Sequence, residues 1–136
     1  MLHTLRTLIN DDKIWFEILM DIANNFRHKI IDGQDIINYI NNKVNKDFSY
    51  FFNQYLNYND IPEFEYAFQK EGRNITLICK WNTAVNFNMP LLINLGKEED
   101  IWIYPTNDIT EIDLGSFDKH LFNIRTDLFY IDVKKM

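Results

Sequence analysis

The sequence predicts an α+β protein in which N-terminal helices precede a small antiparallel β-sandwich. Apolar residues recur with a period of about 3.6 over the first 57 positions, and the period changes to 2 after residue 61. Seven short apolar segments with frequent turn signals follow, as is typical of a sandwich. We therefore expect a helical segment at residues 1–59 and a β-sandwich at residues 60–136.

The first helix begins without a residue that can cap it. Leu2, Leu5, Leu8 and Ile9 follow the helical period, but nothing ahead of them offers a side-chain acceptor for the free N–H groups. This pattern is typical of the interior of a helix in a longer chain. We expect these four residues to form an exposed interface through which the chain self-associates.

Three further helices begin at aspartates, whose carboxylates accept the free N–H groups of a first turn. These are Asp11 and Asp12, then Asp32 with Asp35 in an approximate capping box, then Asp47. The predicted apolar faces are Trp15, Ile18, Leu19, Ile22 and Phe26; then Ile36, Ile37, Ile40 and Val44; then Phe48, Phe51, Phe52, Tyr55 and Leu56. The second helix is expected to end in the basic run 27–29, and Pro62 prevents continuation of the last one.

The strands are predicted from alternation and from turn residues. Phe64, Tyr66 and Phe68 alternate with less apolar residues, and a turn at Glu71 and Gly72 leads into a second alternating run at 75–81, which predicts a hairpin. Five further strands are expected at residues 90–95, 101–104, 109–114, 121–124 and 128–133.

Composition excludes several classes of partner. The chain has 14 basic and 20 acidic residues and a net charge of -6, which argues against a nucleic-acid surface. Hydrophobic residues make up 46%, typical of a packed globular protein, but no apolar run reaches the roughly 20 residues that a membrane span needs. The first ten residues are too polar for a signal peptide, and the sequence leaves the compartment open.

The residues that usually carry chemistry do not form a recognisable motif. His3, His28 and His120 have no second His or carboxylate at i+4 on a shared helix face, so we expect no metal site and no cofactor in this chain. The four glycines are isolated in turns, which gives no phosphate loop. Cys79 lies in an apolar strand and is expected to be buried and inert. No catalytic residue is assigned.

Several stretches, taken in order, resemble the aminopeptidase N (alanyl aminopeptidase) family of gluzincin zinc metallopeptidases, particularly its bacterial members. MLHTLRTLINDDKIWFEIL resembles the helix after the family's catalytic tyrosine. DFSYFFNQYLNYNDIPEFEYAF is similar to the end of the catalytic domain and the entry into the sandwich. KWNTAVNFNMPLLINLG, IWIYPTNDITEIDL and LFYIDVKKM are similar to the sandwich strands and the chain end.

The resemblance implies a non-catalytic role for these residues. The family holds zinc with an HExxH helix and a further Glu, and grips the substrate with a GxMEN strand; none of these motifs is present here. The resemblance therefore implies that the chain is the end of a thermolysin-like catalytic domain followed by a sandwich that braces this domain. It implies that the chain is inactive alone and that the whole enzyme removes N-terminal residues from peptides. The partners would be the catalytic domain of the same polypeptide and, in the whole enzyme, zinc and a peptide.

The alternative is a free-standing β-sandwich module that binds a peptide or a glycan. A ring of exposed aromatic side chains on one sandwich face would favour it. The candidates for such a ring are Trp81, Phe87, Trp102 and Tyr104, although their positions favour packing in the core or at its rim.

Overall fold

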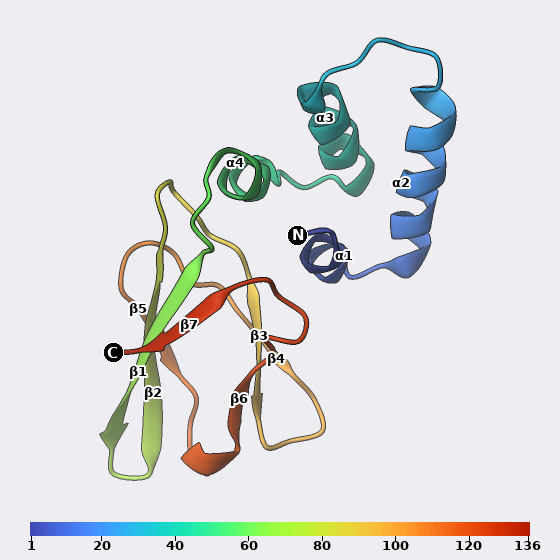
Figure 1. The fold of residues 1–136 in the computed structure, drawn as a ribbon. Coiled ribbons are helices and arrows are strands. Elements are labelled where there is room, and N and C mark those ends of the chain that lie inside the picture. The colour runs from blue at the N-terminus through green and yellow to red at the C-terminus, as the bar shows by residue number, and fades with distance from the viewer.

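The computed structural model describes all residues 1–136 and has four helices followed by two small sheets (Figure 1). The helices are α1 (Leu2–Ile9), α2 (Asp12–Asn25), α3 (Gly33–Val44) and α4 (Ser49–Asn57). They gather at one end of the strands, and α2 lies on the side away from the sandwich. This arrangement confirms the predicted α+β class, and the change from helices to strands falls between Asn57 and Glu63.

Aspartates start α2 and α3 as the sequence predicts. The Asp11 carboxylate accepts a hydrogen bond from the Ile14 N–H, and Asp32 and Asp35 form a reciprocal capping box. Asp47 accepts from the Ser49 N–H at 2.8 Å, although Phe48 is the N-terminal flanking residue of α4. At α1, Met1 provides no side-chain cap.

Three details of the helix predictions are wrong. Leu19 on α2 and Leu56 on α4 are exposed by 44% and 55% of their surfaces, because each helix has only one face against its neighbours. The basic run 27–29 lies beyond the end of α2, which stops at Asn25. His28 has a φ of 59°, so the chain has already turned out of the right-handed helix there.

The first sheet has the strand order β5-β2-β1-β7. Strands β1 (Glu63–Glu71) and β2 (Asn74–Asn82) form the predicted hairpin, with Phe64 opposite Trp81 and Tyr66 opposite Cys79. Strand β5 (Thr110–Asp113) pairs antiparallel with β2, whereas β7 (Asp132–Lys135) pairs parallel with β1. The last strand was expected at residues 128–133. It starts later, because residues 125–128 make a turn in which the Leu128 N–H donates to the Arg125 carbonyl.

The second sheet has the order β4-β3-β6, with all pairs antiparallel. Its strands are β3 (Leu91–Leu95), β4 (Ile101–Ile103) and β6 (Phe122–Ile124), and a short 3-10 helix, η1 (Lys119–Leu121), precedes β6. The two sheets face each other as an open sandwich, so β4 and β5 remain edge strands.

One hydrophobic core runs through both the helices and the sandwich. A single cluster of 21 buried residues includes Leu5, Ile18 and Phe51 from the helices and Leu77 and Ile93 from the sheets. Trp81 is at its centre: its ring packs edge-on against Phe64 and Phe87, and its indole N–H donates to the Met89 carbonyl at 3.0 Å.

The backbone of Tyr130 joins the helices to the sandwich. Its N–H donates to the Thr4 Oγ1 of α1 at 2.9 Å, and its carbonyl accepts from the Tyr55 hydroxyl of α4 at 2.6 Å. Phe129, the preceding residue, is buried in the core. We call this set of contacts the Tyr130 clamp. Because Thr4 and Tyr55 lie on different helices, the backbone of one residue before β7 holds both helices against the sheets.

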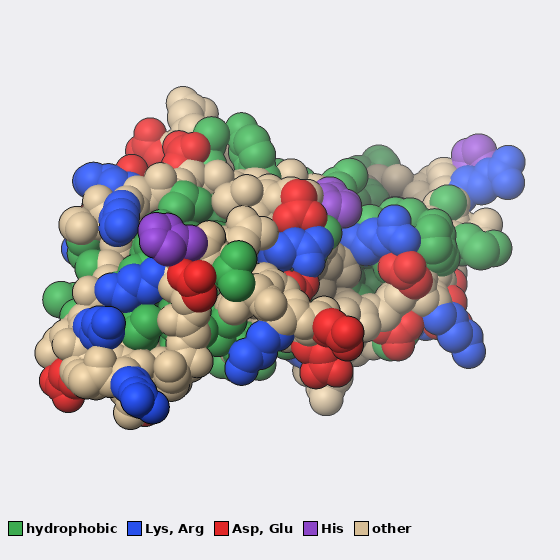
Figure 2. Space-filling view, turned by 90° about the horizontal axis from the view of Figure 1, so that it is seen from below, with side chains coloured by type: hydrophobic (Ala, Val, Ile, Leu, Met, Phe, Trp, Pro, Cys, Tyr) green, Lys and Arg blue, Asp and Glu red, His purple; other side chains and the backbone are tan.

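The surface carries charges of both signs. Figure 2 shows Lys and Arg side chains interspersed with Asp and Glu over one face instead of gathered into a single patch. None of the four helices is both long enough and apolar enough to cross a bilayer.

Candidate functional site

The interface predicted at α1 is largely buried within the chain. Leu5, Leu8 and Ile9 belong to the core and expose at most 7% of their surfaces, whereas Leu2 is exposed. The expectation that all four residues are exposed is therefore wrong, because α1 packs against both the other helices and the sandwich. The exposed apolar surface of the helices lies instead on α2, where Phe16, Leu19 and Met20 form a stripe at helical spacing.

The three histidines do not build a metal centre. His3 lies on α1, His28 in the turn after α2 and His120 in η1, and all three are exposed. No group of three or more His, Cys, Asp or Glu side chains comes close enough to hold a metal ion. The residues of this chain therefore bring together no set of zinc ligands.

Cys79 is a buried core residue. Its side chain has no exposed surface, and burial raises the pKa of the thiol to about 11. At neutral pH the group is therefore a thiol rather than the nucleophilic thiolate.

The four aromatic candidates for a binding ring do not share one exposed face. Trp81 and Phe87 are buried in the core, and Trp102 is half-buried with its ring edge-on to Phe129. Only Tyr104 is substantially exposed, at 67%. A planar stacking surface for a sugar ring is not formed by this set.

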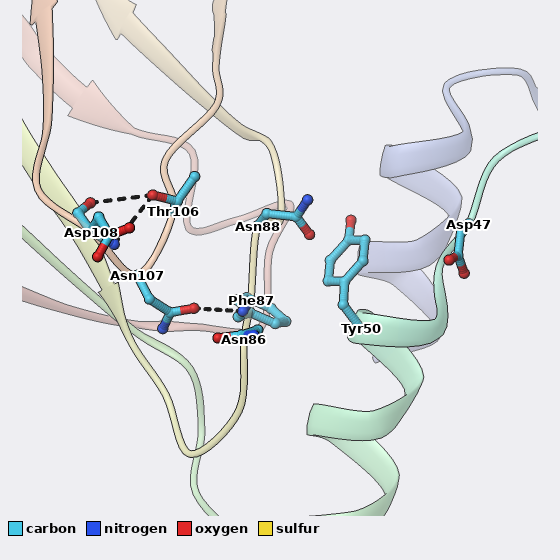
Figure 3. A pocket seen from close by; sticks show the side chains of 8 residues that line it. All are labelled: Asp47, Tyr50, Asn86, Phe87, Asn88, Thr106, Asn107 and Asp108. Atoms are coloured by element: carbon cyan, nitrogen blue, oxygen red, sulfur yellow. Dashed lines mark hydrogen bonds between the residues drawn. The ribbon is translucent and has the colours of Figure 1, made fainter.

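The structure brings together a polar cleft that the sequence did not predict (Figure 3). It has a volume of about 570 Å³ and lies between the start of α4 and two loops of the sandwich. Asp47 and Tyr50 come from the helical side, and segments 86–88 and 106–108 come from the sandwich. In Figure 3 the Tyr50 side chain reaches across towards Asn88, and its ring packs edge-on against Phe87. The cleft was missed because its lining comes from three segments that are distant in sequence, the start of α4 and two mostly polar loops, and no periodic pattern connects them.

Asn107 has a structural role in this cleft. Its amide nitrogen donates to the Trp81 carbonyl at 3.1 Å and to the Thr83 hydroxyl at 2.8 Å, and its carbonyl oxygen accepts from the Phe87 N–H at 2.6 Å. Both ends of the amide are therefore occupied in joining the two loops. Asp47 is similarly occupied by hydrogen bonds from Asn41 and Ser49.

The remaining groups of the cleft can bind polar ligands but do not form a catalytic pair. The side chains of Asn86 and Asn88 and the Tyr50 hydroxyl make no hydrogen bond within the protein. Burial raises the pKa of Tyr50 far above neutrality, with a smaller contribution from Asp47, so the phenol stays protonated. Amide groups and a neutral phenol recognise peptide-like or hydroxyl groups. Asp108 also lines the cleft, but only its backbone groups hydrogen-bond to the Thr106 hydroxyl, so no side-chain pair of nucleophile and base is formed.

Comparisons with known proteins point to a distant aminopeptidase-like fold. No protein-family model matches the sequence, and no curated protein matches it. Among solved structures, the chain is similar to the crystal structure of Legionella pneumophila aminopeptidase A in complex with aspartic acid, with a TM-score of 0.78 and 17% sequence identity. The match covers 98% of this chain but only 17% of that chain, so both the helices and the sandwich correspond to one small part of a much longer aminopeptidase.

Proposed function

We propose that residues 1–136 are a non-catalytic, C-terminal-type part of a bacterial zinc metallo-aminopeptidase, in which they brace the catalytic domain. In this proposal, residues 1–59 complete the catalytic domain and residues 60–136 form a sandwich domain. The whole enzyme would hold zinc and remove N-terminal residues from peptides. The observation that carries the proposal is the likeness to an aminopeptidase over 98% of this chain, helices and sandwich together.

The contacts between the helices and the sandwich support a bracing role. The shared core and the Tyr130 clamp make the helical segment and the sheets one packed unit. A sandwich joined in this way holds the helices in place, and the helices can in turn support a domain that packs against their other side. It does so without any catalytic group of its own.

The apolar stripe on α2 supports a larger protein around this unit. Phe16, Leu19 and Met20 expose between 44% and 65% of their surfaces, and α2, which carries them, lies on the side of the helices away from the sandwich (Figure 1). Exposed apolar area is disfavoured by about 25 cal/mol per Å², so such stripes usually contact a partner. The catalytic domain of the same polypeptide is the partner that the proposal assigns to it.

The most direct test reads the coding DNA upstream of Met1. The proposal expects an open frame, continuous with Met1, that encodes HExxH and GxMEN motifs. A stop codon in that frame, followed by a separate translation start, would contradict it and favour the free-standing module.

A second test uses the isolated chain. We expect no turnover of a panel of aminoacyl-coumarin substrates and no stoichiometric zinc after dialysis. Turnover that a chelator abolishes would contradict the proposal. Sedimentation gives a further readout: the wild type should self-associate through the stripe, and the double variant Phe16→Gln, Met20→Gln should be monomeric. Leu2→Gln, an exposed leucine outside the stripe, is the matched control.

The alternative function, a free-standing module that binds a peptide or a glycan, keeps one observation in its favour. The aromatic ring that it required is not formed, but the sandwich has an open apolar groove at one edge. A closed upstream frame together with peptide binding at this groove would favour the alternative.

A further inference from the structure

An apolar groove opens where the two sheets end side by side. It has a volume of about 350 Å³ and lies between β4 of one sheet and β5 of the other. Ile101, Ile103, Ile112 and Leu114 line it, and seven of its nine lining residues are hydrophobic. The groove exposes the interior of the sandwich between two edge strands.

The backbone of β4 has free hydrogen-bonding groups at this edge. The Leu92 carbonyl accepts from the Arg125 N–H, so residue 92 faces β6, and its neighbours Leu91 and Ile93 pair with Ile103 and Ile101 of β4. Because the backbone groups of successive strand residues point to opposite sides, the Trp102 N–H and C=O point away from β3. An unpaired edge of this kind is a template for another strand.

Negative charge lies beside the groove. Asp113 of β5 lines it, and Glu98 and Glu99 lie in the turn before β4. None of these three carboxylates forms a salt bridge, whereas Asp100, next to Glu99, pairs with Arg125. Lys97 is the one basic residue in the turn before β4.

We propose that this edge binds an extended peptide segment of a partner protein in which apolar and basic side chains alternate. The segment adds as a strand to β4 and pairs with the backbone of Trp102. Its apolar side chains enter the groove, and its Lys or Arg side chains face the free carboxylates. This is strand addition, in which backbone hydrogen bonds give affinity and pockets for alternate side chains give specificity.

Charge argues against a second copy of this chain as the occupant. Two copies that meet edge to edge would bring their free carboxylates together, and each chain carries a net charge of -6. Like charges placed opposite each other oppose pairing. The proposal does not depend on the aminopeptidase assignment, since it rests only on the edge strands, the groove and the charge around it.

The test titrates the folded chain with a capped basic peptide, KVKLKVK, and with its charge-reversed counterpart, EVELEVE. We expect saturable binding of the basic peptide that weakens as salt increases, and protection of the Trp102 amide from hydrogen exchange on binding. The substitution Ile101→Gln should weaken binding by about tenfold, a loss of about 1.4 kcal/mol. Met20→Gln, a similar change on α2, should leave it unchanged.

Four results would overturn the proposal. One is the absence of saturable binding while circular dichroism shows a folded chain. A second is equal binding of the acidic peptide, and a third is unchanged affinity in Ile101→Gln. The fourth is a concentration-dependent dimer that protects the Trp102 amide without peptide, which would identify a second copy as the occupant.

Discussion

The Tyr130 clamp gives a quantitative test of how the helices hold the sandwich. Thr4→Val keeps the size of the side chain but removes the oxygen that accepts the Tyr130 N–H. Thr4 exposes only 1% of its surface, so water cannot easily replace it. A buried donor left without a partner costs about 1–3 kcal/mol, against a total stability of about 5–15 kcal/mol for a domain.

The second half of the clamp is removed by Tyr55→Phe. This change deletes the hydroxyl that donates to the Tyr130 carbonyl, but the carbonyl remains accessible to water. A cost of about 0.5–1.5 kcal/mol is therefore expected, as for an ordinary hydrogen bond. Because both hydrogen bonds act on one residue, the double variant should deviate from additivity by about 0.5–3 kcal/mol.

Urea unfolding followed by far-ultraviolet circular dichroism measures these costs, with an unchanged denaturant slope as the sign that only stability has altered. Thr7→Val is the matched control, since its hydroxyl donates only to the His3 carbonyl within α1. Amides of β7 should also exchange faster in Thr4→Val. If Thr4→Val and Thr7→Val have the same unfolding midpoint, the clamp does not couple the helices to the sandwich.

Three other predictions concern the core, a turn and an ion pair. Trp81→Ala should cost about 3–5 kcal/mol and Trp81→Phe less, measured by urea unfolding; an unchanged midpoint in Trp81→Ala would mean that the ring is exposed. Gly96→Ala should destabilise far more than Gly72→Ala, because both have positive φ but only at Gly96 would a Cβ lie 2.6 Å from the Leu121 side chain; equal melting temperatures would contradict this. Hydrogen bonds from Lys134 and Lys80 lower the pKa of Glu65 in the folded protein. The ionised Glu65 therefore stabilises the fold fully at pH values above the ordinary carboxyl pKa, and this stabilisation is lost as the pH falls through the lowered pKa of the folded state. Glu65→Gln should therefore flatten the acid side of the stability curve, and parallel curves would refute the pairing.

Local chemistry made much of the fold predictable. The Asp32 capping box, the Asp11 cap and the β1–β2 hairpin each depend on residues close together in sequence. The capping box and the hairpin were predicted with the correct residues, and Asp11 was one of the two aspartates expected to cap its helix. Backbone hydrogen bonds and turn geometry act over a few residues, so composition and spacing carry their signal.

Features that depend on distant segments could not be predicted in the same way. The parallel pairing of β7 with β1 joins residues 63–66 to residues 132–135, and alternation does not reveal which edge a last strand takes. The polar cleft is lined by the start of α4 and two sandwich loops, and its two free asparagines resemble any other asparagines in this chain. Loop residues have no period, and only the packed fold brings them together.

The amphipathic pattern of the helices was informative about apolar faces but not about which face meets which neighbour. Leu5 and Leu8 were expected at an interface and lie in the core, whereas Phe16, Leu19 and Met20 lie outside it. A helix that is apolar on more than one side needs more than one neighbour. Within residues 1–136, α1 has its neighbours on both sides and α2 does not. A free-standing module would have to tolerate the stripe on α2 as exposed surface. If the chain instead braces a catalytic domain, the stripe is buried against that domain. The proposal of a larger aminopeptidase therefore accounts for the apolar residues of the stripe.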